Sequence, residues 1–362
     1  YSGFDGATVP ICTFTLGKQH LAQFVGSYIR LSDFRGADQQ GPKTLEAILN
    51  KNCGWFYTAK PDDFKKIPGS PVAYWVSNKV RKIFEMSPLM GSMSDARQGL
   101  ATADNNRFLR LWFENDFDRI GFGLSNSDEA KKSGKKWFPY NKGGEFRKWY
   151  GNQEFVINWE NDGYDIKSYD KSVIRNPSYY FLPSVSWSDV TSSTNAFRFY
   201  PKGFIHDSTG HSVFGLDKFK TAVISLFCNN NFATEIIKIL NPTMHFHVGY
   251  FNSLPYPDRM IDVDHFDLLI DIARADWDSY EVSWGFMRNP MVLTNEKNLK
   301  VSFEKFECSK NKLIGKTKNL EEENNRLFIN AYDLQDEISP DVPEDQITLA
   351  RADREKDCQR LI

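Results

Sequence analysis

The chain has 362 residues, of which 41% are hydrophobic and 25% charged, with a formal net charge of -2. This composition is typical of a soluble globular protein with a real core, organised as one large or two to three ordinary domains. A run of eighteen apolar residues does not occur, which argues against a membrane span. Five widely spaced cysteines without a CxxC pair argue against a disulfide framework or a zinc site and fit the reducing cytoplasm. The start lacks an initiator Met and a signal peptide and reads like the middle of a longer chain.

The first 43 residues are predicted to form β-strands followed by a linker. A β-rich run extends from Val9 to Leu16 and an extended piece from Phe24 to Phe34, so we expect a hairpin or adjacent strands at a sheet edge. The polar, Gly- and Pro-punctuated stretch 35–43 is the linker candidate. Short helices are expected from Thr44 and from Asn78.

The segment QGLATADNNRFLRLWFE (98–114) holds residue types that can read base edges. Arg pairs with guanine and Asn with adenine, so Asn105, Arg107 and Arg110 are candidates for base-edge or adjacent contacts. The alternative interpretation is a capped turn that leads into a strand, FLRLWFE.

A basic segment, KKSGKKWFPYNKGGEFRKWY (131–150), carries seven basic residues and one acidic residue. Aromatic residues are interleaved with the bases, a combination that suits a nucleic-acid backbone because cations neutralise phosphates and flat rings stack on bases or sugars. The alternative is a solvated basic face beside ordinary core aromatics. The candidate phosphate contacts are Lys135, Lys136, Lys142, Arg147 and Lys148.

A third segment, 185–214, alternates short β-like pieces with Ser/Thr/Gly turns. Its Ser188, Ser192, Ser193, Arg198 and Lys202 offer hydroxyl and cationic partners for phosphates. Ordinary turn chemistry explains the serines nearly as well.

Helical patterns dominate the last third of the chain. Helices are expected over 218–227 and 232–240, in an amphipathic stretch within 258–289, and as one long helix or helical pair over 299–337. From 321 to 362 the sequence holds twelve acidic and five basic residues. We therefore expect this acidic region to face away from nucleic acid, and its last dozen residues to fray.

Catalytic motifs are missing. The sequence shows no Gly-rich loop that could bind a cofactor. It also shows no (N/D)-P-P-(Y/F) loop, the motif that holds an adenine flipped out of DNA. Asn-Pro-Ser-Tyr-Tyr (176–180) is the nearest text and is interpreted as a decoy. His245 and His247 would share one face of a strand, but the sequence shows no nearby carboxylate or Cys to complete a metal site. No catalytic, cofactor-binding or metal-ligating residues are predicted.

Several segments together resemble the PglX family, large adenine-specific DNA methyltransferases of BREX phage-defence systems. KWFPYNKGGEFRKWYGN is the most specific of them; a GLxTxDNxRFxR segment beginning at Gly99, with Ala103 in place of the commoner Gly, and NPTMHFHVGYFNSLPYP (241–257) also match. His206 stands where relatives more often have Phe, so no function is assigned to it.

The resemblance implies an α+β fold in three parts. These are remnant strands of a methyltransferase sheet with a linker (1–43), a mixed α/β target recognition domain (44–257) and a helical C-terminal region (258–362). The intact protein would transfer a methyl group from S-adenosylmethionine to adenine N6 in double-stranded DNA, in the cytoplasm, with other BREX proteins as possible partners. This portion would hold no cofactor and be inactive alone.

Two alternatives remain at this point. The chain could be a protein-interaction module of a phage-defence complex that docks through its aromatics and its acidic helix. It could also be the specificity region of a fused restriction–methylation enzyme, because the parts that would distinguish such a parent lie upstream.

Overall fold

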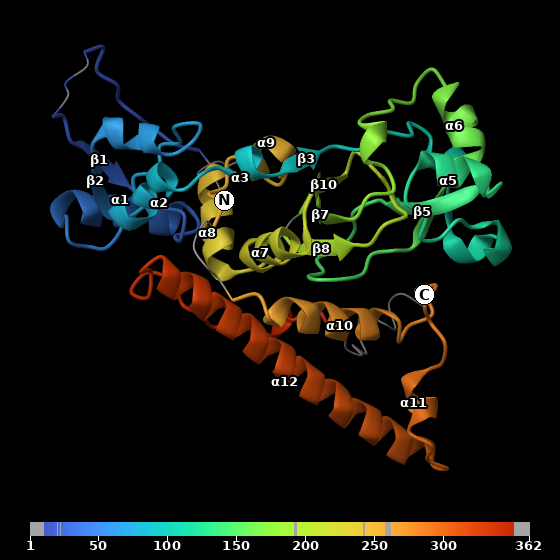
Figure 1. The fold of residues 1–362 in the computed structure, drawn as a ribbon. Coiled ribbons are helices and arrows are strands. Elements are labelled where there is room, and N and C mark those ends of the chain that lie inside the picture. The colour runs from blue at the N-terminus through green and yellow to red at the C-terminus, as the bar shows by residue number, and fades with distance from the viewer. Residues whose placement is uncertain are drawn as a thin grey trace. The chain divides into compact units, whose positions relative to one another are not determined.

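The computed structural model describes residues 11–19, 21, 23–191, 194–241, 243–257 and 262–350 (Figure 1). The chain divides into two compact units, Tyr1–Met86 and Ser87–Ile362. Helices and small sheets occur together in the chain, which confirms the predicted α+β class.

The first unit is built on a two-stranded sheet. Strand β1 (Gly26–Ile29) pairs antiparallel with β2 (Phe56–Ala59), and α1 (Ala37–Leu49), a 3₁₀ helix (Pro61–Lys66) and α2 (Asn78–Met86) complete the unit. Two strands alone bury too little surface to be stable. An aromatic cluster supports them: the Tyr28 ring stacks on Tyr74 at 4.5 Å and meets Phe64 edge-on at 5.9 Å.

Two predictions for this unit were wrong in part. The first two residues of the expected first strand, Val9 and Pro10, lie outside the described ranges, and residues 11–16 have no regular structure. β1 therefore pairs with β2, about thirty residues further along the chain, rather than with the preceding run. The predicted linker is helical, since α1 starts at Ala37 rather than at Thr44 and accommodates Pro42. The helix predicted from Asn78 is confirmed.

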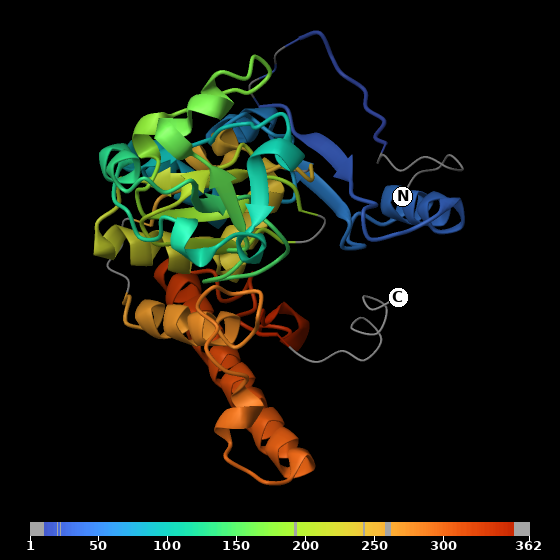
Figure 2. The same ribbon diagram turned by 90° about the vertical axis from the view of Figure 1, so that its right-hand side faces the viewer.

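The second unit contains two four-stranded sheets. One has the order β3 (Asp95–Arg97), β10 (Gly210–Phe214), β7 (Ser184–Ser188) and β8 (Phe197–Tyr200), and all its neighbours are antiparallel. The other has the order β4 (Leu109–Leu111), β6 (Phe155–Asn158), β5 (Trp137–Asn141) and β9 (Ile205–His206), with β5 and β9 parallel. Figure 2 shows the cyan to yellow-green strands of these sheets together with the short helices that lie between them in sequence.

The core beside the second sheet is aromatic. Phe108, Phe138, Tyr140, Trp159 and Phe181 belong to one buried cluster. The short helices of this region are α3 (Met90–Met93), α4 (Asn105–Phe108), α5 (Ser127–Lys132) and α6 (Glu160–Lys167), and residues 161–163 at the start of α6 are left-handed.

Gly99 shows how closely the two sheets' connections approach. A Cβ atom at this position would lie 1.8 Å from the carbonyl oxygen of His206. The neighbouring Leu100 amide donates a hydrogen bond to that same oxygen at 2.8 Å. Only glycine permits this approach of one backbone to the other.

Helices form the rest of the second unit, where the predicted α7 (Lys218–Cys228) and α8 (Asn231–Leu240) are confirmed. The side chains of Asp217 and Asn230 accept hydrogen bonds at the starts of these two helices, as N-cap residues do. After α9 (Val248–Asn252), α10 (His265–Trp277) and α11 (Pro290–Leu293) comes α12 (Leu299–Ala331), the predicted long helix. None of the helices described is both long and apolar enough to cross a membrane.

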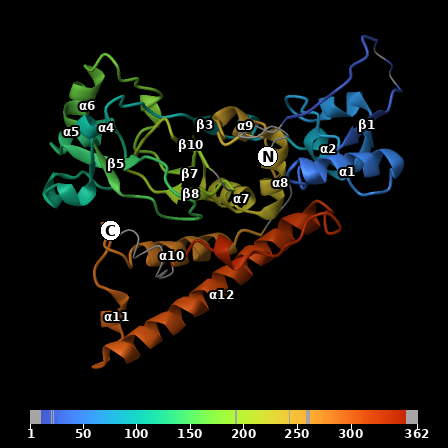
Figure 3. The ribbon, with the colours of Figure 1, turned by 180° about the vertical axis from the view of Figure 1, so that it is seen from behind.

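Helix α12 packs against α8 and α10 (Figures 1 and 3). The Phe328 ring lies 5.6 Å from the Phe227 ring of α7, and the Asn324 side-chain amide donates to the Leu226 carbonyl at 2.9 Å.

Glu321 joins α12 to the β-rich part of the unit. Its buried carboxylate accepts a hydrogen bond from the Lys148 ammonium at 2.7 Å and another from the Trp149 indole N–H at 2.8 Å. Both side chains of the ion pair are nearly inaccessible, at 8% for Lys148 and 2% for Glu321. The attraction is therefore poorly screened by solvent, and removing one partner leaves an uncompensated buried charge.

We predict that Glu321→Ala destabilises the second unit by about 3–5 kcal/mol, because the Lys148 ammonium then stays buried without its carboxylate. Urea unfolding followed by tryptophan fluorescence measures the effect. Glu307→Ala, at an exposed position of the same helix, is the matched control and should change stability by less than about 0.5 kcal/mol. Equal effects of the two substitutions would show that the Lys148–Glu321 pair does not stabilise the fold.

Candidate nucleic-acid interface

The aromatic residues of the basic segment 131–150 belong mainly to the core. Trp137, Phe138, Tyr140, Trp149 and Tyr150 are each at most 8% exposed. They cannot stack on bases without unfolding of the surrounding structure, so this part of the prediction was wrong. The rings lie on β5 and in the loop that follows it, where they fill the interior.

Two of the predicted phosphate contacts are structural ion pairs. Lys148 is buried against Glu321 as described above, and the Arg147 guanidinium lies 2.7 Å from the buried carboxylate of Asp276 in α10. Lys310 of α12 contacts the other oxygen of Asp276. Glu321 of the acidic C-terminal region thus neutralises Lys148 directly. The expectation that this region faces away from nucleic acid stays a prediction.

Lys142 and Arg198 are also engaged within the fold. The Lys142 ammonium lies 2.9 Å from the carboxylate of Asp207, whose other contacts include the Tyr140 hydroxyl at 2.5 Å. Burial, and then the charge of Asp207, raise the pKa of Tyr140 well above its ordinary value, so this phenol stays a hydrogen-bond donor. The Arg198 guanidinium is buried and donates to the Arg147 carbonyl and to Ser188 Oγ.

Other predicted cations lie nearer the surface. Lys135 contacts the carbonyl of Asp118, Lys136 lies 3.8 Å from Glu160, and Lys202 is exposed and donates to Ser125 Oγ at 3.0 Å. Lys131 and Lys132 are exposed in the last turn of α5. These two lysines belong to the basic segment, but its sequence pattern did not single them out.

One residue of segment 105–110, Arg110, lies near the same aromatic ring as Lys136. The Arg110 guanidinium is 5.7 Å from the centre of the Trp137 ring, and the Lys136 ammonium is 5.8 Å from it. Arg107 is exposed and lies 5.1 Å from the Tyr169 ring. Asn105 is exposed and accepts a hydrogen bond from the Thr102 hydroxyl at 2.5 Å. The Asp104 carboxylate accepts a hydrogen bond from the Arg107 amide at 3.0 Å, which confirms the capped turn.

We call this surface the α5 rim. The name stands for a set of exposed or half-buried polar and cationic side chains, some of them on or next to α5 and the start of β5, namely Asn105, Arg107, Arg110, Lys131, Lys132, Lys135, Lys136 and Lys202. Acidic residues accompany it, because Asp128 and Glu129 occupy the first turn of α5. Ser192 and Ser193, two further phosphate-contact candidates, lie outside the described residues.

Asn-Pro-Ser-Tyr-Tyr at 176–180 contributes to packing. The Asn176 side-chain amide donates to the Gln98 carbonyl at 2.9 Å. Tyr180 is buried, and its ring meets Trp159 edge-on at 5.4 Å. Both side chains are therefore committed to contacts within the fold.

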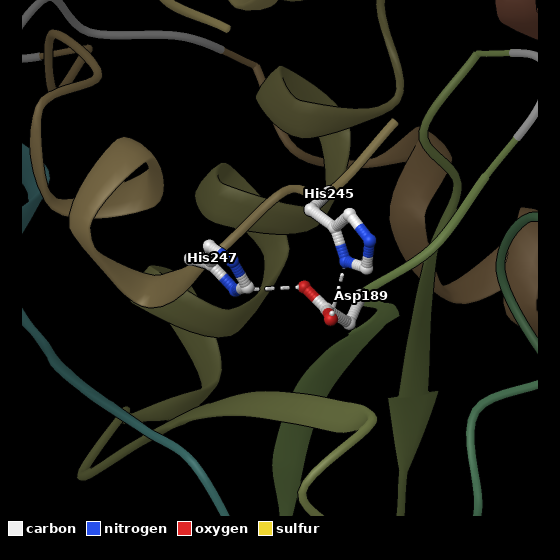
Figure 4. A group of neighbouring side chains, drawn as sticks. All are labelled: Asp189, His245 and His247. Carbon is white, nitrogen blue, oxygen red and sulfur yellow. Dashed lines mark hydrogen bonds and ion pairs between the residues drawn. The ribbon is translucent and has the colours of Figure 1, made fainter. Parts of the chain in front are cut away.

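A group that the sequence did not reveal lies at the end of β7. The carboxylate of Asp189 is 3.1 Å from His245 Nδ1 and 2.9 Å from His247 Nδ1 (Figure 4). The interpretation that no carboxylate accompanies these two histidines was wrong. Asp189 lies more than fifty positions earlier in the chain, and an antiparallel bridge between Val190 and His245 brings the two segments together.

Comparison with known proteins identifies the class to which the chain is related. No protein-family model matches it. The chain is nevertheless homologous over its whole length to adenine-specific methyltransferases, and the resemblance inferred from sequence motifs is confirmed.

The relatives are of the PglX and BrxX type. The chain is 36% identical over 378 residues to the adenine-specific methyltransferase PglX of Lacticaseibacillus casei (strain Zhang), a match that covers 100% of this chain and 31% of that protein. It is 30% identical over 338 residues to the adenine-specific methyltransferase BrxX of Escherichia coli O9:H4 (strain HS), a match that covers 91% of this chain and 26% of that protein. The chain thus spans less than a third of the length of the curated relatives it matches.

His206 generates a pH prediction. This residue is buried in β9, its Nδ1 atom lies 3.1 Å from Ser212 Oγ, and burial lowers the pKa of its imidazole to about 3. Between about pH 6.5 and 3 the unfolded chain binds a proton at this position that the folded chain does not. The contribution to stability is therefore complete above about pH 6.5 and is lost as the pH falls towards 3.

When the pH falls from 7.5 to 5, we expect the unfolding free energy of His206→Phe to decrease by about 2 kcal/mol less than that of the wild type. Urea unfolding at the two pH values gives this difference. Ile205→Val, at the preceding buried position of β9, removes no titratable group and is the control; it should retain the pH dependence of the wild type. An unchanged pH dependence in His206→Phe would contradict the lowered pKa.

Proposed function

We propose that this chain is the DNA-contacting, target-recognising portion of a site-specific adenine-N6 DNA methyltransferase that marks self DNA in phage defence. The observation that carries the proposal is the homology to two adenine-specific methyltransferases along the chain. S-adenosylmethionine supplies the methyl group in such a reaction. The groups that bind it, and those that hold the adenine, are proposed to lie in the part of the parent that this chain does not include.

The α5 rim is the proposed DNA-contacting surface. Its lysines would neutralise phosphates and so set affinity and salt dependence. Asn105, Arg107 and Arg110 are proposed to reach base edges or the adjacent backbone. Exposure supports this assignment, because a cation already desolvated against a carboxylate, such as Lys148, would have to break a buried ion pair before it could bind a phosphate.

The buried cations have a different proposed role. Arg147 and Lys148 hold the loop after β5 against α10 and α12 through their ion pairs. Nearby, Lys142 pairs with Asp207, and Arg198 donates a hydrogen bond to Ser188. We propose that they position the β5 region and act on DNA binding only through that position. The bounds of the target recognition domain, 44–257, remain a proposal, and the helical region from 258 onward would support it.

One observation favours a second function, docking of another protein of the defence system. Large apolar side chains are exposed close together in sequence around α11 and the start of α12, namely Met287, Val292, Leu293, Leu299 and Phe303. Clusters of exposed apolar residues often mark interaction sites. This surface involves residues different from those of the α5 rim, so variants of the two can be tested separately.

We predict that the chain binds random-sequence duplex DNA and that log affinity falls linearly with log salt. Lys131→Gln/Lys132→Gln and Lys135→Gln/Lys136→Gln should each weaken binding for all sequences alike and reduce the slope, by about 0.9 for each phosphate that the chain no longer neutralises. Fluorescence anisotropy with labelled duplex at several salt concentrations measures both quantities.

The matched control is Lys312→Gln/Lys316→Gln, which removes the same charge from exposed positions of α12. It should leave the salt slope unchanged. Absence of binding at low salt would contradict a DNA-contacting role for this chain, and equal weakening by control and rim variants would contradict the assignment to the α5 rim. Arg107→Ala should instead cost roughly 1–3 kcal/mol at a recognised site and relax specificity at one position.

A further inference from the structure

We propose that Asp189, His245 and His247 form a binding site for a divalent transition-metal ion, with Zn²⁺ as the best match. Two imidazole nitrogens and one carboxylate oxygen are a ligand set that zinc sites use. The site is separate from the α5 rim and adds a function to the chain that is independent of DNA binding.

The donor atoms converge on a small volume. His247 Nδ1 lies 2.9 Å from Asp189 Oδ1, and His245 Nδ1 lies 3.1 Å from Asp189 Oδ2. All three donors lie within 4.8 Å of one another. Tetrahedral ligands at about 2.0–2.1 Å from zinc are separated by roughly 3.3 Å, so small side-chain movements suffice to bind the ion. In Figure 4 both imidazoles turn towards the carboxylate.

The backbone holds the three residues in place. The Asp189 carbonyl accepts a hydrogen bond from the Phe246 amide at 2.7 Å, between the two histidines, and the Trp187 indole N–H donates to the Phe246 carbonyl at 2.8 Å. Asp189 directly follows β7, and His247 directly precedes α9. The site therefore lies on a scaffold of paired backbone, which limits the reorganisation that ion binding requires.

A second layer orients the carboxylate. His211 of β10 is buried, and its Nε2 atom lies 3.2 Å from Asp189 Oδ1. Because a carboxylate oxygen can only accept, this contact is a hydrogen bond that His211 donates from Nε2. Hydrogen bonds of this kind to a ligand are typical of metal sites and fix the ligand's orientation.

The remaining coordination position would face water. The side chains of His245 and His247 are 53% and 58% exposed, whereas that of Asp189 is 11% exposed. The ion would ligate the Nδ1 atoms of neutral imidazoles, each of which would then carry its proton on Nε2. The ion would connect the end of β7 to the segment that leads into α9. It would thereby stabilise this region, in which both β7 and α9 are only five residues long.

The test is a Zn²⁺ titration of the chelator-treated chain, in competition with a chromophoric chelator. We expect one ion per chain and a higher melting temperature with Zn²⁺ present, since an ion that binds the folded state stabilises it. A Co²⁺ titration identifies the ligands from the absorption spectrum, which should lack the thiolate charge-transfer band of cysteine ligation.

The variants His245→Asn and His247→Asn separate a metal site from a hydrogen-bonded cluster. Asparagine places an amide N–H near the position of Nδ1, so contact with Asp189 can persist while the imidazole ligand is removed. Each variant should weaken Zn²⁺ binding by about 100-fold or more and keep the melting temperature of the metal-free chain. His265→Asn, outside the cluster, is the control and should bind Zn²⁺ like the wild type.

The proposal fails if the wild type takes up no Zn²⁺ at micromolar concentration, which would leave a hydrogen-bonded cluster only. It also fails if either cluster variant binds Zn²⁺ as tightly as His265→Asn does, or if the Co²⁺ spectrum shows thiolate ligation.

Discussion

The packing of the second unit depends on two buried carboxylates that form ion pairs with basic residues of segment 131–150. Glu321 of α12 binds Lys148, and Asp276 of α10 binds Arg147 and Lys310. The Lys148–Glu321 and Arg147–Asp276 pairs join helices late in the chain to the loop after β5, and Lys148 and Glu321 are 173 positions apart. Removal of either partner would leave the other charge buried and unpaired, which is strongly destabilising. The positions of α10, α12 and the loop after β5 are therefore coupled.

This coupling divides the cations of the basic segment into two sets. Those in the loop after β5 are neutralised within the fold, whereas those at the end of α5 and the start of β5 lie nearer the solvent. The local excess of positive charge available to a phosphate backbone is therefore smaller than the sequence indicates and is displaced towards α5. The aromatic residues between the bases serve the core, because β5 lies inside its sheet between β6 and β9.

The end of β7 concentrates polar groups from distant parts of the chain. Ser188 accepts a hydrogen bond from Arg198, and the carboxylate of Asp189 contacts the imidazoles of His211, His245 and His247. Asp207, which directly follows β9 of the other sheet, plays a similar role: its carboxylate pairs with Lys142 and accepts a hydrogen bond from the Tyr140 hydroxyl. Buried carboxylates thus organise both sheets, since each can accept several hydrogen bonds at once and must do so to offset its desolvation.

The sequence alone determined the α+β class, the helices α2, α7, α8 and α12, and the homology to adenine-specific methyltransferases, because periodicity and motif text are local properties. It misplaced the start of α1 and the partner of β1, since Gly41 and Pro42 resemble a break and strand pairing is not local. Tertiary structure alone decided which cations are buried, that the aromatics of 137–150 fill the core, and that Asp189 joins His245 and His247. Each of these depends on through-space contacts between residues far apart in the chain, for which the order of amino acids carries no local signal.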